Sequence, residues 1–329
     1  QDPEDNIVTA CCRAFEEAAT NIGYTIQPLR VTLEKRLPIG SGLGSSASSI
    51  VAALEALNRW HAHLLPAQEL FGLMAKMEGA ISGEVHLDNV APCLYGGLRL
   101  CPPGSQQEYA LPWPGAWRAV VCWPGTRLET REARSVLPDS VDRKIAVRHG
   151  AQFAQFVHAL HSGNARLAGE CVVDHIAEPY RRSLLPGFDE ARVELREMGD
   201  LAVGISGSGP TIFALVHDYD VANRAANWLD RNYKKNDTGF VHVCRADLGG
   251  ARAVDRGAGQ MKLINTRHRS DSISFREAVL QGLGRGQGLF FPASFESLDD
   301  VPGLLQEPFI ERSVAVLAHL IGDEVAETT

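Results

Sequence analysis

The chain has 329 residues, 45% of them hydrophobic and 22% charged, which is ordinary for a globular protein with a large core and suggests about two domains. A formal net charge of −8 argues against nucleic acid or an anionic membrane as a partner, and no apolar run approaches the roughly 20 residues that span a bilayer. The 7 cysteines are odd in number and form no C-x-x-C pair, which predicts reduced thiols and a cytoplasmic protein rather than disulfides or a zinc site.

Helical spacing of apolar residues dominates the first part of the chain. It predicts helices over residues 6–23, 45–60 and 66–81. Between the first two, residues 26–35 alternate and predict a strand that leads into a glycine-rich loop. A further strand is expected at Leu98–Leu100.

The second part mixes short apolar strands with amphipathic helices. Strands are predicted at 117–123, 211–216 and 241–245, and helices at 141–161, 164–175, 188–198 and 221–233. A second glycine-rich stretch at 204–210 precedes one of these strands. This order predicts an α+β domain with an antiparallel sheet.

The first glycine-rich loop carries the clearest functional signal. It reads Pro38-Ile39-Gly40-Ser41-Gly42-Leu43-Gly44-Ser45-Ser46-Ala47 and is followed at once by a helical pattern. Glycines that admit close approach, together with the bare amides at a helix start, make an anion site that most often binds phosphate. The alternative is a loop that only connects two elements. No lysine follows Gly44, so this is not a P-loop, and the pattern is not that of a dinucleotide-binding unit either.

This loop resembles the P-x-x-x-G-L-G-S-S-A signature of the GHMP kinases, and residues from Asp5 to about Asp255 resemble the homoserine kinases within that family. Four further motifs carry the resemblance: Glu78 with His86-x-x-Asn89-Val90-Ala91-Pro92 and Gly96-Gly97, Thr130-Arg131-Glu132-Ala133-Arg134, Glu178-Pro179-Tyr180-Arg181, and Gly204-Ile205-Ser206-Gly207-Ser208-Gly209-Pro210. The resemblance implies an α+β fold of two domains. The first, at 1–114, is an incomplete α/β domain that binds ATP, and the second, at 115–256, is ferredoxin-like.

The same resemblance implies the ATP and metal ligands. The ATP phosphates would be bound by Pro38, Ile39, Gly40, Ser41, Gly42, Leu43, Gly44, Ser45 and Ser46. Mg²⁺ would be held by Ser46 and Glu78, since this ion takes oxygen ligands and keeps several waters. Glu78 follows an otherwise apolar helix face, so its alternative role is that of a solvated helix-end carboxylate.

The acceptor side is likewise implied by resemblance. The substrate would be L-homoserine, bound by His86, Asn89, Thr130, Arg134 and Arg181 and phosphorylated to O-phospho-L-homoserine for threonine biosynthesis. Asn89, Arg134 and Arg181 would be catalytic, and because Asn89 cannot act as a base, the substrate hydroxyl would attack directly. For either arginine the alternative is a surface ion pair, and for His86 it is a structural role. A homodimer is compatible with the sequence, which does not decide the oligomeric state.

The C-terminal part changes character. Residues 257–260 form a Gly/Ala-rich junction, and Met261 to Thr329 resembles the start of threonine synthase, without the cofactor lysine of that enzyme. The expected third domain is therefore 257–329, a partial segment without a pyridoxal phosphate site. The kinase part reads as truncated at its start. Alternatives to homoserine kinase are an inactive fragment that binds ATP phosphates, or another GHMP small-molecule kinase. The junction is compatible with a natural fusion or with two joined genes.

Overall fold

A computed structural model describes residues 6–82, 87–105, 107–199, 201–253, 263–273, 275–293, 298 and 301–321. The chain divides into two compact units, Gln1–Arg252 and Ala253–Thr329, which are considered one at a time. No helix in these described ranges has the length and apolarity needed to cross a membrane. The predicted boundary at residue 114 within the larger unit stays a prediction.

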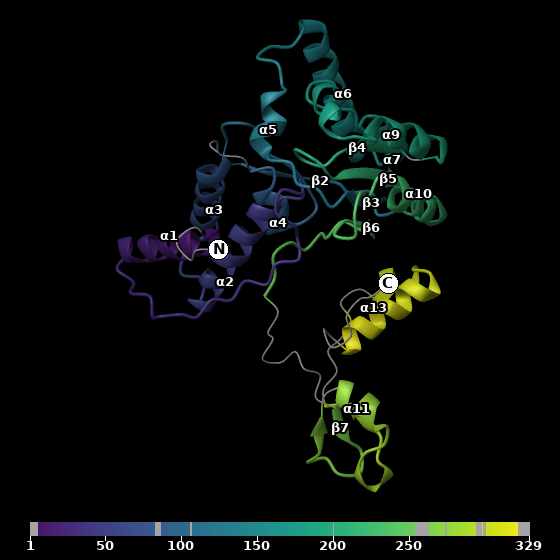
Figure 1. Cartoon of the computed structure of the whole chain (residues 1–329). Helices are drawn as coiled ribbons and strands as arrows, with labels where there is room; N and C mark the ends of the chain where they lie inside the picture. The colour runs from purple at the N-terminus through teal and green to yellow at the C-terminus, as the bar shows by residue number, and fades with distance from the viewer. Residues whose placement is uncertain are drawn as a thin grey trace. The chain divides into compact units, whose positions relative to one another are not determined.

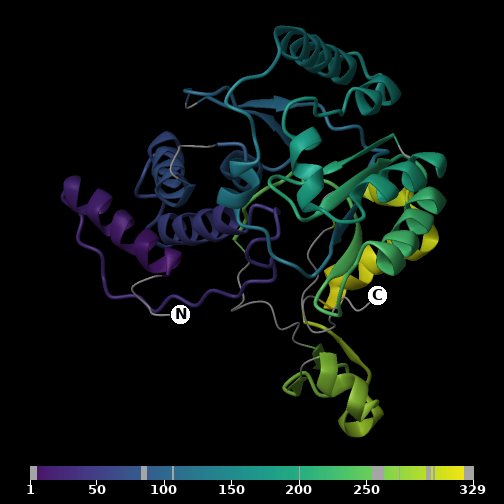
Figure 2. The ribbon, with the colours of Figure 1, turned by 45° about the horizontal axis from the view of Figure 1, so that its top comes forward.

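Helices form the first part of the larger unit (Figure 1). They are α1 (Ile7–Asn21), α2 (Ser45–Trp60), α3 (Ala67–Ser82) and the short α4 (Val90–Tyr95), which confirms the three predicted helices. Asn6 begins α1 by accepting a hydrogen bond from the Val8 amide at 2.9 Å. The apolar stripes meet in one core around Phe15, Ile50 and Met74, and α1 lies beside α2 in both ribbon views (Figures 1 and 2).

The strand predicted at 26–35 is wrong. Residues 24–36 form no strand; Ile26 and Leu29 are partly buried against the helical core, whereas Val31 and Leu33 are 44% and 38% exposed. Alternation shows only that a segment can join a sheet, whereas a ladder forms where a neighbouring strand supplies the partner groups. Among the described residues, no strand pairs with this segment.

The second part of the larger unit is built on an antiparallel sheet of four strands. In spatial order these are β4 (Ala202–Ile205), β5 (Ile212–Val216), β3 (Arg118–Trp123) and β6 (Phe240–Cys244). The predicted strands and the antiparallel arrangement are confirmed. A separate hairpin pairs β1 (Leu98–Leu100) with β2 (Tyr109–Leu111).

Alternation along these strands separates two apolar faces. Val120 and Ala214 point into a core formed with α9 (Phe188–Glu197) and α10 (Tyr219–Asn232). Trp117 and Leu215 point to a second core with α6 (Arg143–His161) and α7 (Ala165–Glu170). The sheet is therefore covered on both sides, as Figure 2 shows.

The connection after α7 differs from the prediction. The helix expected over 164–175 ends at Glu170, because the β-branched Val172 and Val173 follow and Asp174 begins a new turn. That turn leads into α8 (Glu178–Arg181) and the 3₁₀ turn η2 (Arg182–Leu184). A further short helix, α5 (Thr130–Ser135), follows β3.

The smaller unit has a sheet of three antiparallel strands. Its spatial order is β8 (Ser272–Ile273), β7 (Leu263–Asn265) and β9 (Phe290–Pro292). The remaining elements are α11 (Phe275–Gln281), η3 (Arg285–Gln287), α12 (Val301–Leu305) and α13 (Phe309–Ile321). Asn265 is fully buried, and its amide donates to the Arg285 carbonyl at 2.9 Å.

Candidate active site

The first glycine loop, Pro38–Gly44, is held by a second glycine loop, Ser206–Thr211, that joins β4 to β5. The Ser206 hydroxyl donates to the Gly42 carbonyl at 2.9 Å, and the Thr211 amide donates to the Ser41 carbonyl at 3.3 Å. Gly42 has a φ of +80°, and a Cβ there would lie 2.5 Å from the Ser206 carbonyl oxygen. Only glycine fits at this crossing, so the two loops fix each other.

The start of α2 is shaped to receive an anion. Gly44 is the N-cap residue, with a φ of +66°, and it has no side chain to bond the first amides of the helix. The Ser45 hydroxyl instead donates to the Leu37 carbonyl at 3.2 Å. A 16-residue helix also places the positive end of its dipole at this point.

Lys35 adds a positive charge that the sequence reasoning missed. Its ammonium donates to the Ser45 carbonyl and to the Ser49 hydroxyl, each at 2.9 Å, so it lies against the first turn of α2. Desolvation lowers the pKa of Lys35. The only sequence signal was a basic residue three positions before Pro38, and such residues are usually solvated.

The two predicted magnesium ligands are brought together. The Ser46 hydroxyl of α2 donates to a carboxylate oxygen of Glu78, on α3, at 3.1 Å. Glu78 is only 6% exposed, so it is not a solvated helix-end residue. The negative charge of Glu78 also acts on Cys93: burial raises the pKa of that thiol, and Glu78 raises it further.

Asn89 lies near the start of α2, although it is itself the N-cap residue of α4. Its side-chain oxygen would be 3.1 Å from a Cβ built on Gly44, the N-cap residue of α2. The structure therefore places the Asn89 amide against the first glycine loop. His86, the other predicted residue of this motif, lies outside the described residues.

Arg181 connects the acceptor-side elements to the glycine loops. Its Nε donates to the Ala133 carbonyl of α5 at 3.2 Å, and one terminal nitrogen donates to the Gly207 carbonyl at 3.1 Å. Burial lowers the pKa of Arg181, the carboxylate of Asp174 raises it, and Arg134 lowers it. Arg181 thus contacts α5 at the residue next to Arg134, and guanidinium groups on two adjoining elements can attract a carboxylate or phosphate.

Thr130 begins α5 and is exposed, while Arg134 is half-buried in its last turn. The segment before α5 is fixed to the first glycine loop, because the Leu128 amide donates to the Gly40 carbonyl at 3.1 Å. The short helix that carries Thr130 and Arg134 is therefore joined to the first glycine loop through Leu128 and to the second through Arg181. Apart from His86, the predicted site residues lie on elements that these contacts connect.

Models of known protein families match three stretches of the chain. A model of the GHMP kinases N terminal domain matches residues 6–97, and one of the GHMP kinases C terminal region matches residues 156–235. Residues 262–329 match the threonine synthase N terminus. The smaller unit is thus similar to the beginning of that enzyme.

Solved structures with a similar fold include a homoserine kinase from Cytophaga hutchinsonii, at 32% identity and a TM-score of 0.70, covering 77% of this chain and 80% of that chain. A putative homoserine kinase from Listeria monocytogenes is 23% identical, with a TM-score of 0.53 over 75% of this chain and 80% of that one. A phosphomevalonate kinase from Streptococcus pneumoniae is 15% identical, with a TM-score of 0.58 over 75% and 82%. The last two show the fold alone. With both domain models matched and most of a 32% identical kinase covered, this chain belongs to the GHMP kinase family.

Proposed function

We propose that this chain is a homoserine kinase that transfers the γ-phosphoryl group of ATP to the side-chain hydroxyl of L-homoserine. The observation that carries the proposal is the placement of Arg181, which donates to the carbonyl of Ala133, the neighbour of Arg134 on α5, and to the second glycine loop. A pair of guanidinium groups beside a phosphate cradle suits an acceptor with a carboxylate. The 32% identity to a homoserine kinase supports L-homoserine as that acceptor.

The first glycine loop and the start of α2 would bind the ATP phosphates. The bare amides after Gly44 and the ammonium of Lys35 supply positive potential without a basic surface, which fits a chain of net charge −8. Since the loop is fixed by Ser206 and Thr211, the cradle is formed before the nucleotide arrives.

Ser46 and Glu78 fit a magnesium ion. A buried carboxylate against a hydroxyl is the kind of oxygen set that Mg²⁺ accepts beside phosphates and water. When bound, the ion would neutralise charge between the phosphates. The Ser46–Glu78 hydrogen bond keeps both oxygens at the cradle.

The acceptor hydroxyl would attack directly. A bond forms between its oxygen and the γ-phosphorus, the bond to the β,γ-bridging oxygen breaks, and the hydroxyl proton leaves to a phosphate oxygen or to water. Asn89 cannot accept that proton, so its amide would orient groups at the start of α2. Positioning and electrostatics therefore supply the rate enhancement, as is general for phosphoryl transfer.

A cytoplasmic location belongs to the same proposal. The seven cysteines are all free, and burial raises the pKa of Cys11 and of Cys122 to about 12. Thiols of this kind are inert and suit a reducing compartment.

The test is ADP release by the full chain with ATP, Mg²⁺ and L-homoserine, mevalonate or galactose as acceptor, with product detection by ³¹P NMR. We expect turnover with L-homoserine alone, and we expect Glu78→Gln to lose it while still folding. Turnover with mevalonate but not L-homoserine would identify another GHMP small-molecule kinase. ATP binding without turnover of any acceptor would identify an inactive binder of ATP phosphates.

A further inference from the structure

We propose that Asp174 and Glu178 are positioning residues for Arg181. They hold α8 so that the Arg181 guanidinium bridges α5 and the second glycine loop. The inference rests on the proposed function, because it assigns these residues to the acceptor side of that site. Neither carboxylate was assigned a role by the sequence reasoning.

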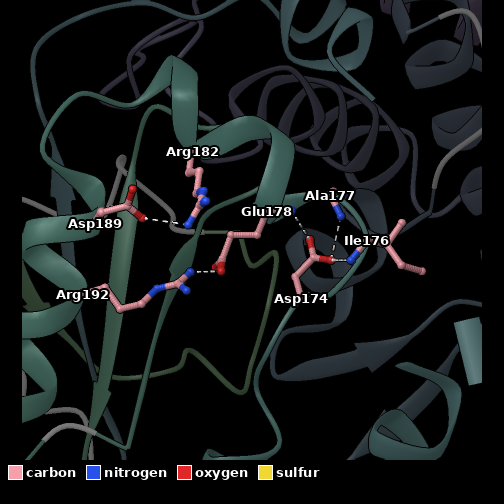
Figure 3. A network of polar contacts seen from close by, with 7 residues as sticks. All are labelled: Asp174, Ile176, Ala177, Glu178, Arg182, Asp189 and Arg192. Atoms are coloured by element: carbon pink, nitrogen blue, oxygen red, sulfur yellow. Dashed lines mark hydrogen bonds and ion pairs between the residues drawn. The ribbon is translucent and has the colours of Figure 1, made fainter. Parts of the chain in front are cut away.

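Asp174 fixes the start of α8. Its carboxylate accepts hydrogen bonds from the amides of Ile176, Ala177 and Glu178 at 2.7, 2.8 and 3.1 Å (Figure 3). Three amides directed at one carboxylate determine where the chain turns into the helix. The same negative charge acts favourably on the Arg181 guanidinium and opposes the lowering of its pKa by burial.

Glu178 fixes α8 from the side of α9. Its side chain is 8% exposed and forms an ion pair with Arg192 (Figure 3). The guanidinium of Arg192 lies 4.9 Å from the ring centroid of Phe188, which is fully buried. Burial lowers the pKa of Arg192. Removal of one partner of such a pair leaves an uncompensated charge, so the pair resists displacement of α8.

These anchors matter because α8 cannot hold its own position. It has four residues, well below the length at which a helix is stable by itself. Arg181 is its last residue, and the donor directions of a guanidinium are fixed by its planar shape. A shift of α8 would therefore break the bonds to Ala133 and Gly207 and move the positive charge relative to the first glycine loop.

A neighbouring ion pair provides a matched control. Arg182 and Asp189 also join the α8 region to α9, at 3.5 Å, but their side chains are 52% and 66% exposed (Figure 3). An exposed pair contributes little to position or stability. Removing this pair should leave the KM values for ATP and for L-homoserine unchanged.

The test compares Asp174→Ala, Asp174→Asn and the double variant Arg182→Ala with Asp189→Ala in the full chain. We expect Asp174→Ala to raise the KM for L-homoserine by about tenfold or more, with the KM for ATP nearly unchanged. Asp174→Asn keeps one oxygen acceptor and should recover part of the loss, and the double variant should behave as wild type. Equal changes in both KM values, or a lower Tm with unchanged kinetics, would assign Asp174 a purely structural role and overturn the proposal.

If Asp174→Ala fails to fold, Glu178→Gln tests the same proposal. It retains the shape of the side chain and should produce the same selective rise in the KM for L-homoserine. Wild-type turnover tests the proposed function separately. If the wild type phosphorylates no acceptor, the Nε–H resonance of Arg181 in ¹⁵N-arginine-labelled protein, assigned with Arg181→Lys, still decides. Loss of its exchange protection in the Asp174 variants supports the positioning role, and unchanged protection contradicts it.

Discussion

The first glycine loop is held by backbone contacts and one short hydroxyl, that of Ser206, whereas the acceptor side is held by a long side chain. Gly42 meets the second glycine loop at a crossing where no Cβ fits, and Leu128 is bonded to Gly40 through main-chain atoms. Across the site, α5 is joined to the second loop through the guanidinium of Arg181. The difference teaches that the phosphate cradle depends on glycines, which have no side chain to separate the two loops. The acceptor site depends on the correct placement of one long side chain, that of Arg181.

The largest effect is expected from Gly42→Ala. The new methyl group would lie 2.5 Å from the Ser206 carbonyl oxygen and 2.6 Å from that of Gly209, at a φ of +80°. The loops must separate, and we expect kcat/KM to fall by about 100-fold or more. ADP release measures the loss.

Gly104→Ala is the matched control for this prediction. Gly104 also has a positive φ, +72°, but a methyl group added there would meet nothing within 4 Å beyond its chain neighbours. It should show the cost of backbone strain alone, about 1–2 kcal/mol of stability, with normal kinetics. Equal activity loss in both variants would refute the role of the loop crossing.

The next effect is expected from Arg181→Met, which tests the acceptor half of the comparison. It removes both bonds that join α5 to the second loop and one charge near Arg134. One charge-assisted bond from Arg181 to the acceptor carboxylate would contribute about 1.5–3 kcal/mol, so kcat/KM for L-homoserine should fall by about 10- to 100-fold, while ATP affinity changes little. Steady-state kinetics against each substrate measure the split. Arg182→Met, at the exposed neighbour, should have no effect, and a similar loss there would argue against a specific role of Arg181.

Local chemistry explains how much of this could be predicted. The glycines, the start of α2 and the Ser46 hydroxyl are contiguous in sequence, so the loop and its helix were predicted with the right boundaries. Glu78 was predicted from the family resemblance, and its position at the end of an apolar helix face left a solvated carboxylate as the alternative. The strand at 26–35 was wrong, because pairing depends on a neighbour that no local pattern reveals. Lys35, Asp174 and Glu178 were missed for a related reason, since their roles depend on contacts that only folding creates.

Lys35→Met is expected to have a smaller effect on activity than Arg181→Met. It should affect the ATP side of the site and leave the acceptor side unchanged. The ammonium lies at Ser45 and Ser49, on the cradle side. Its loss removes one positive charge near the phosphates, so the KM for ATP should rise by about tenfold with the KM for L-homoserine unchanged. Isothermal titration with a non-hydrolysable ATP analogue checks the binding. A rise confined to the KM for L-homoserine would place Lys35 on the acceptor side instead.

The smallest expected effect is a pH dependence of ATP binding that comes from the same residue. Desolvation lowers the pKa of Lys35 from its ordinary value of 10.5, so the folded protein loses this charge at a lower pH than the unfolded chain does. Below the folded pKa the ammonium attracts phosphate, and above it the amine is neutral; affinity should therefore decline as the pH rises through the folded pKa. The sign for stability is opposite: a lowered lysine pKa costs stability while the group is charged, and this cost disappears with rising pH. Lys35→Arg stays charged throughout that range and should bind ATP with a flat profile. If the ATP affinities of the wild type and of Lys35→Arg decline in parallel at alkaline pH, the decline arises from another group.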